Sequence, residues 1–214
     1  LLITEYNSFF TNARRNGKEL EQNQYVATVA GALFVADLIR VMSQDQRIEA
    51  AMQWSLSGNW VFGAINATDG RGPALVRPVF HVMRMARELL APGGHHLAHE
   101  VRVASVTQPA KQVGYAAPFP NMPLATTVVT REGKTIRALV INKDPTRHAS
   151  LSLDLDGGVA RQVRIEQLRA PEVFAFPDTP QAFELKDTSA SLSADRRQVR
   201  WSQSPASGAL VRNT

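Results

Sequence analysis

Hydrophobic residues recur at two different spacings along the chain, and the change of spacing divides it into two parts. Over residues 25–44 and 78–90, apolar residues return every three or four positions, which predicts two amphipathic helices. A short apolar run precedes each helix, at 1–5 and at 48–54, and each run predicts a strand. The order strand, helix, strand, helix is typical of parallel α/β structures, including (β/α)8 barrels.

Beyond residue 95 the spacing becomes that of short strands. A hairpin is predicted over 126–141, with Gly133 in its turn. Further strands are predicted at 101–106, 150–155, 163–168, 199–201 and 209–211. Short strands separated by turn signals predict an antiparallel β-sandwich, so we divide the chain into domains 1–95 and 96–214. The polar residues 8–24, the glycine-rich residues 55–72 and the proline-rich residues 107–123 are expected to form loops.

Composition narrows the possible partners. Residues 1–100 hold 9 basic and 9 acidic side chains and residues 101–214 hold 15 and 10, so the whole net charge of +5 lies in the second part. The basic residues there are scattered singly, which favours the solvated face of a sheet over a nucleic-acid site. The chain has no cysteine, which excludes disulfides and thiol catalysis. No apolar run approaches the roughly 20 residues of a membrane span. We expect no nucleic-acid partner, no membrane partner and no cofactor.

Three histidines stand close together at the predicted domain boundary. His95, His96 and His99 follow Gly93 and Gly94, in a pattern that invites a metal-site interpretation. Glu100 is the nearby carboxylate, and an exposed linker explains the cluster better. We therefore predict no metal site.

Catalytic and substrate-binding side chains are predicted where the two strands of the first part end. In parallel barrels the functional groups lie at the carboxyl ends of the strands, and Glu5 ends the first apolar run. Tyr6 and Asn7 follow it and offer hydrogen bonds to a carboxylate or to a sugar hydroxyl. Trp54 ends the second run and offers a flat apolar surface for a sugar ring. The loop behind it extends this surface with Asn59, Trp60 and Phe62.

Taken together, these segments resemble the C-terminal part of a clan A glycoside hydrolase. Residues 3–7, Ile-Thr-Glu-Tyr-Asn, are similar to the nucleophile strand of that clan. Residues 29–39 resemble the following helix of family 51 α-L-arabinofuranosidases, 50–54 the last barrel strand, and 138–144 part of the β-sandwich behind the barrel. Family 51 usually has tryptophan in place of Tyr6, and similar motifs occur in families of β-glycosidases.

The resemblance implies a retaining double displacement with Glu5 as nucleophile and Trp54, Tyr6, Asn7, Asn59 and Trp60 as substrate-binding residues. In retaining enzymes the two catalytic carboxyls lie about 5–5.5 Å apart. The acid/base of this clan lies on the fourth strand, which the chain lacks. We therefore expect the last two βα units of a barrel, completed by an N-terminal segment or a second chain, acting on an oligosaccharide or polysaccharide.

Alternatives remain within and outside this class. The complete protein would alternatively be a β-glycosidase or endoglucanase of the same clan. A non-catalytic binding or assembly module is a further possibility. Two βα units alone would expose the apolar faces formed by Val29, Leu33, Val82 and Met83. Exposed apolar faces predict aggregation or association with another chain, including a homo-oligomer.

Overall fold

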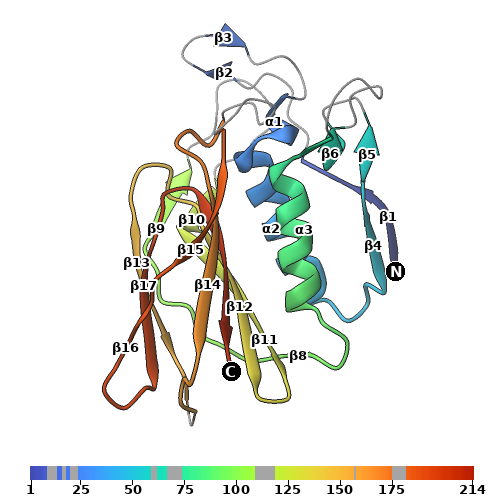
Figure 1. Ribbon diagram of the computed structural model, residues 1–214. Helices are drawn as coiled ribbons and strands as arrows, with labels where there is room; N and C mark the ends of the chain where they lie inside the picture. The colour runs from blue at the N-terminus through green and yellow to red at the C-terminus, as the bar shows by residue number, and fades with distance from the viewer. Residues whose placement is uncertain are drawn as a thin grey trace.

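A computed structural model describes most of the chain. The described residues are 1–8, 14–15, 18–19, 24–58, 62–66, 74–108, 119–156, 158–174 and 182–214. Two parallel strands and two long helices form one side of the molecule, and two antiparallel sheets form the other (Figure 1). None of the helices among these residues is long and apolar enough to cross a membrane.

The helices are α1 (Gln24–Ala27), α2 (Val29–Ser43) and α3 (Pro78–Leu89). The strands are β1 (Leu2–Tyr6), β2 (Arg14–Arg15), β3 (Lys18–Glu19), β4 (Ala50–Gln53), β5 (Ser57–Gly58), β6 (Ile65–Asn66), β7 (Leu75–Val76), β8 (His95–His96), β9 (Ser105–Gln108), β10 (Phe119–Pro123), β11 (Ala125–Glu132), β12 (Thr135–Asn142), β13 (Ala149–Asp154), β14 (Val163–Arg169), β15 (Glu184–Thr188), β16 (Ser191–Leu192), β17 (Gln198–Gln203) and β18 (Ser207–Asn213).

The helix predicted from residue 25 to 44 is interrupted at Thr28. This residue has extended backbone angles and caps α2, because its hydroxyl accepts a hydrogen bond from the Gly31 amide at 3.3 Å. The same hydroxyl donates to the Tyr25 carbonyl at 2.7 Å, which fixes α1 against the start of α2. The prediction of one continuous helix was wrong because the apolar spacing runs through the break.

Gly31 makes the tight corner between α1 and α2 possible, and Gly31→Ala is expected to destabilise the protein. A Cβ at this position would lie 2.4 Å from the Tyr25 carbonyl oxygen and 2.7 Å from that of Val26, so backbone would have to move. We expect a loss of about 1–3 kcal/mol in the free energy of unfolding, measured by urea titration. Gly158→Ala is the control, because its Cβ would meet nothing closer than Leu155 Cβ at 3.8 Å. Equal losses in both variants would contradict the crowding argument.

Two antiparallel sheets pack face to face in the second part of the chain. The larger has the strand order β15-β14-β18-β12-β11-β8, and the smaller has β13-β17-β16. Buried side chains between them include Val140, Ile165 and Val211 from the larger sheet and Val199 and Trp201 from the smaller. Because apolar residues alternate along these strands, the inner faces of both sheets form one buried apolar cluster.

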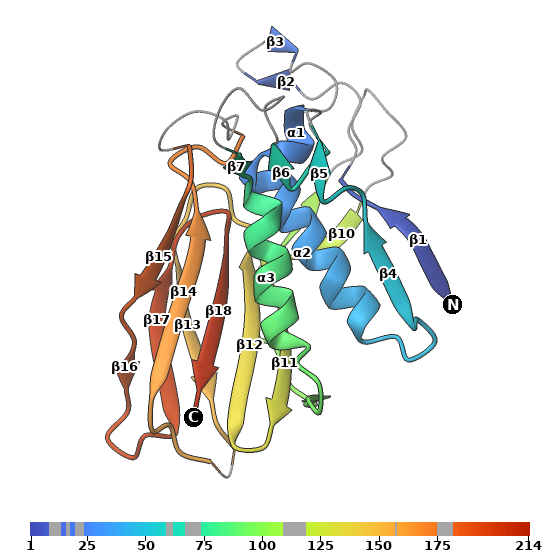
Figure 2. The same cartoon turned by 45° about the vertical axis from the view of Figure 1, so that its right-hand side comes forward.

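The other face of the larger sheet is covered by α2 and α3 (Figure 2). Leu139, Leu168 and Leu210 of the sheet belong to the same buried cluster as the stripes of both helices. The prediction that these stripes stay exposed was wrong: Val29, Leu33 and Val82 are 2%, 8% and 1% exposed, and Met83 is partly buried against this cluster.

Polar contacts also join α2 to the larger sheet. The Asp37 carboxylate accepts hydrogen bonds from Lys143 Nζ at 2.6 Å and from Thr126 Oγ1 at 2.9 Å. Arg40, one turn along the helix, donates to the same carboxylate at 2.6 Å. Burial raises the pKa of Asp37, but the hydrogen bonds from Lys143 and Arg40 outweigh it and the pKa is lowered.

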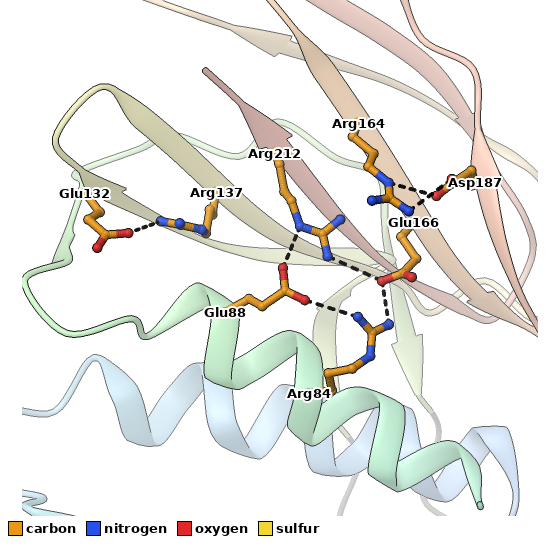
Figure 3. A network of polar contacts seen from close by, with 8 residues as sticks. All are labelled: Arg84, Glu88, Glu132, Arg137, Arg164, Glu166, Asp187 and Arg212. Carbon is orange, nitrogen blue, oxygen red and sulfur yellow. Dashed lines mark hydrogen bonds and ion pairs between the residues drawn. The ribbon is translucent and has the colours of Figure 1, made fainter.

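A ring of four charges joins α3 to the larger sheet (Figure 3). Arg84 contacts Glu88 at 3.1 Å and Glu166 at 2.6 Å, and Arg212 contacts Glu88 at 2.6 Å and Glu166 at 3.4 Å. Each acid therefore bridges the two arginines. We call these residues the junction ring. The hydrogen bond from Arg212 lowers the pKa of Glu88, and burial opposes this to a lesser degree.

Several segments expected to be irregular contain short strands. In the loop expected over 107–123, the first residues belong to β9 and the last to β10, and these two strands pair antiparallel. Residues 109–118 lie outside the described part. The strand expected at 101–106 begins only at Ser105. The loop expected over 55–72 carries β5 and β6, and the linker histidines His95 and His96 pair with β11 as β8.

Candidate functional site

The candidate site lies where the parallel pair β1 and β4 ends. Leu2 pairs with Ala50 and Ile3 with Ala51, but Tyr6 pairs with Gln53. The strand that carries Glu5 therefore holds one residue more than its partner over this stretch. Such a bulge bends a strand and redirects its side chains. The exposed Glu5 lies within this stretch, one residue before Tyr6, whose carbonyl bonds to the residue that follows β4.

That residue is Trp54, whose backbone amide donates to the Tyr6 carbonyl at 3.0 Å. Its indole is 44% exposed and stacks on the ring of Phe62, with 4.5 Å between ring centroids and 21° between planes. Phe62 is only 4% exposed. One aromatic ring thus supports the other from below, and the supported ring presents a surface to solvent beside the strand of Glu5. We call these two rings the aromatic pair.

The backbone around the aromatic pair is closely tied. The Ser55 amide donates to the Phe62 carbonyl at 3.3 Å, and the Ala64 amide donates to the Ser55 carbonyl at 3.0 Å. The Trp54–Ser55 peptide bond is cis. The Gln53 side chain donates to the Trp54 carbonyl at 3.2 Å.

Arg77 supports this loop from the start of α3. It is 2% exposed, its guanidinium donates to the Gly63 carbonyl at 3.1 Å, and its amide donates to the Ala64 carbonyl at 2.9 Å. A Cβ at Gly63 would lie 2.9 Å from the Ile65 carbonyl oxygen, so the loop passes through a space that only glycine fits. Sequence reasoning overlooked Arg77. Its position directly before Pro78 was the available signal, because it places the arginine at the helix start, level with the strand ends.

Tyr6 and Asn7 have their side chains engaged within the protein. Tyr6 lines a cavity of about 320 Å³ together with Ile39, Met42 and Met83, on the face of β1 and β4 that meets the helices. Burial raises the pKa of its phenol. The Asn7 amide donates to backbone carbonyls. Glu5, by contrast, is exposed, whereas Tyr6 is half-buried against the helices.

The other residues predicted for a site are two loop residues and the three histidines. Asn59 and Trp60 lie outside the described residues. His95 and His96 are exposed on β8, and the His99 ring lies 3.0 Å from the Leu97 carbonyl and 3.3 Å from that of Thr127. Within the described ranges, no group of three histidine or acidic side chains is arranged to hold a metal ion.

Comparison with known proteins shows a shared fold. The GH51 arabinofuranosidase from Xanthomonas axonopodis pv. citri superposes with a TM-score of 0.75 at 17% identity over 100% of this chain and 41% of its own. The thermostable GH51 α-L-arabinofuranosidase from Thermotoga petrophila RKU-1 gives 0.72 at 15% identity over 98% and 42%.

A glycoside hydrolase of a second family has the same fold. The catalytic domain of the GH30 xylanase C from Talaromyces cellulolyticus gives a TM-score of 0.61 at 15% identity over 100% of this chain and 40% of its own. The chain thus spans about two fifths of the length of these structures. No protein-family model and no curated protein matches the sequence.

Proposed function

We propose that this chain forms the C-terminal part of a retaining glycoside hydrolase that releases terminal α-L-arabinofuranosyl groups from plant polysaccharides. The observation that carries the proposal is Glu5, exposed at the bulged end of β1, the strand that pairs with β4, which the exposed Trp54 follows. The fold shared with GH51 enzymes supports it. Residues 1–95 then supply the last two βα units of a (β/α)8 barrel and residues 96–214 a β-sandwich.

In this proposal Glu5 acts as the nucleophile. Its carboxylate attacks the anomeric carbon, the bond to the leaving oxygen breaks, and that oxygen takes a proton from a second carboxylic acid. Water then attacks the anomeric carbon of the resulting glycosyl ester while the second carboxylate accepts a proton from it. The bond to Glu5 breaks, and the Glu5 carboxylate is released. The second carboxylic acid comes from the N-terminal segment or second chain that completes the barrel, and has to lie about 5–5.5 Å from Glu5.

The substrate is held by aromatic and amide groups. The exposed ring of Trp54 offers an apolar surface to the C–H face of a sugar, with Asn59 and Trp60 extending it along an oligosaccharide. Tyr6 and Asn7 support this surface from within the protein, because their side chains contact protein groups.

The substrate class is tested by assaying the complete protein on three substrates side by side. We expect turnover of an aryl α-L-arabinofuranoside, with arabinose released in its original anomeric configuration by NMR. An aryl β-xyloside and a β-glucan serve as the comparison, because the GH30 xylanase fold makes a β-glycosidase of the same clan the second candidate. Turnover of the xyloside or glucan alone would replace the proposed activity by that alternative. Turnover of none of them would favour a binding or assembly module.

A further inference from the structure

The Asn7 side chain forms hydrogen bonds with three backbone groups at the candidate site. Its Nδ2 donates to the Trp54 carbonyl and, at 3.5 Å, to the Phe62 carbonyl. Its Oδ1 accepts from the Ser8 amide at 2.8 Å. One amide nitrogen thus reaches the carbonyls of both residues whose rings stack. Both ends of the amide are thus committed to the backbone of the candidate site.

These contacts determine where the Trp54 indole stands. The Trp54 amide is tied to the Tyr6 carbonyl at 3.0 Å, and its carbonyl is tied by Asn7 and by Gln53. With the backbone held at both ends, the stacked Phe62 leaves the indole one supported face and one exposed face. Loss of the Asn7 donor would remove one hydrogen bond from the carbonyls of both residues of the pair at once, and would leave them the Gln53 side chain and the Ser55 amide as donors.

We infer that Asn7 is a positioning residue that fixes the aromatic pair relative to Glu5. Asn7 stands two positions after Glu5 on one continuous segment, with only Tyr6 between them, so the same backbone sets the position of the carboxylate and of the ring surface. The inference rests on the proposed function, because it assigns the aromatic pair to substrate binding. It assigns Asn7 no contact with the substrate.

The first test measures the position of Trp54 without any sugar. Asn7→Asp keeps the shape of the side chain and the acceptor for the Ser8 amide, but it replaces the donor by an oxygen and adds a negative charge. In the complete protein, the fluorescence of Trp54 is isolated by subtracting a matched Trp54→Phe variant. We expect a red-shifted emission and stronger acrylamide quenching in Asn7→Asp. Asn7→Ala, which adds no charge, is expected to give the same change.

Asn142→Asp is the matched control. Asn142 is 1% exposed and its Nδ2 donates to the carbonyls of Arg147 at 3.2 Å and Ser204 at 2.9 Å, while its Oδ1 accepts from the Asp144 amide at 3.1 Å. Asn142→Asp therefore loses an amide donor to two backbone carbonyls, as Asn7→Asp does, but on β12 and away from the candidate site. We expect lower stability with unchanged Trp54 fluorescence. An unchanged Trp54 spectrum in both Asn7 variants overturns the inference, whatever the activity.

The second test separates positioning from general destabilisation by kinetics on the aryl α-L-arabinofuranoside. We expect KM to rise about tenfold in Asn7→Ala while kcat changes less than twofold, because the ring surface is displaced and Glu5 is untouched. The pH profile of kcat is expected to stay in place. An unchanged KM, or a fall in kcat alone, overturns the inference. A wild-type protein that lacks this activity refutes the proposed function instead, and the fluorescence result still decides the position of Trp54.

Discussion

Glu5→Gln in the complete protein is expected to lower kcat by about 10⁴-fold or more, with the fold intact. A neutral amide of the same shape cannot form the glycosyl ester, and removal of a covalent nucleophile costs factors of this order. Glu5 is exposed at a strand end and makes no contribution to either buried cluster. Stability should therefore change by less than about 0.5 kcal/mol. Turnover of the aryl glycoside and a urea titration measure the two quantities.

Glu49→Gln is the matched control for this substitution. Glu49 is an exposed carboxylate beside the same strand pair, and its amide donates to the Leu1 carbonyl at 3.0 Å, at the opposite end of β1 from Glu5. Loss of a carboxylate there is expected to leave kcat unchanged. For Glu5→Ala, added azide is expected to restore turnover and yield a glycosyl azide, because the small anion occupies the vacated position. Full activity in Glu5→Gln would end the assignment of Glu5 as nucleophile.

Glu166→Gln is expected to cost about 3 kcal/mol of unfolding free energy. The Glu166 side chain is 11% exposed and is the acceptor that Arg84 and Arg212 share in the junction ring. Removal of one charge from a buried ion network leaves the opposite charges without compensation, which typically costs 3–5 kcal/mol. We place the value at the lower end because Arg84 is 33% exposed and retains Glu88. Urea unfolding of both variant and parent provides the measurement.

The neighbouring strand β15 supplies the control, because Asp187 pairs with Glu166 across the sheet. Arg164 and Asp187 form an ion pair at 3.2 Å (Figure 3), and their side chains are 62% and 61% exposed. Asp187→Asn is expected to cost less than about 1 kcal/mol, since exposed pairs contribute little. Joint replacement of Glu166 by Leu and Arg212 by Met is expected to recover most of the loss, because two apolar side chains leave fewer charges buried. Equal costs for Glu166→Gln and Asp187→Asn would contradict the burial argument.

The extent to which sequence predicted the fold follows from the strength of each local signal. The helix expected over 78–90 matches α3, because Pro78 defines its start and the apolar stripe continues to Leu89. The hairpin over 126–141 matches β11 and β12 because both strands are apolar and Gly133 adopts a positive φ of 55° between them. In contrast β15, with the sequence ELKDT, lacks an apolar alternation and was not predicted. It exists because its backbone pairs with β14.

For the candidate site, the sequence predicted which strands lie together but not which way their side chains point. The adjacency of Glu5 and Trp54 follows from two parallel strands that end at one edge, and β1 and β4 do pair in that way. The bulge that shifts Tyr6 onto the helix face leaves no mark in the apolar pattern. Nor does the pattern indicate that Phe62 turns back to support Trp54, since that depends on the loop held by Arg77. Such features arise from tertiary contacts, which no local pattern records.

The place of β18 in the larger sheet has a consequence for the order of assembly. This strand lies between β12 and β14, and the hairpin of β11 and β12 meets the pair of β14 and β15 only through it. The surface on which α2 and α3 pack is therefore incomplete until residues 207–213 have been synthesised and inserted. Long-range pairing of this kind slows folding and leaves strand edges open meanwhile. During translation, the strands of Glu5 and Trp54 are made before β18, so the helices behind them gain their complete support only when this last strand is in place.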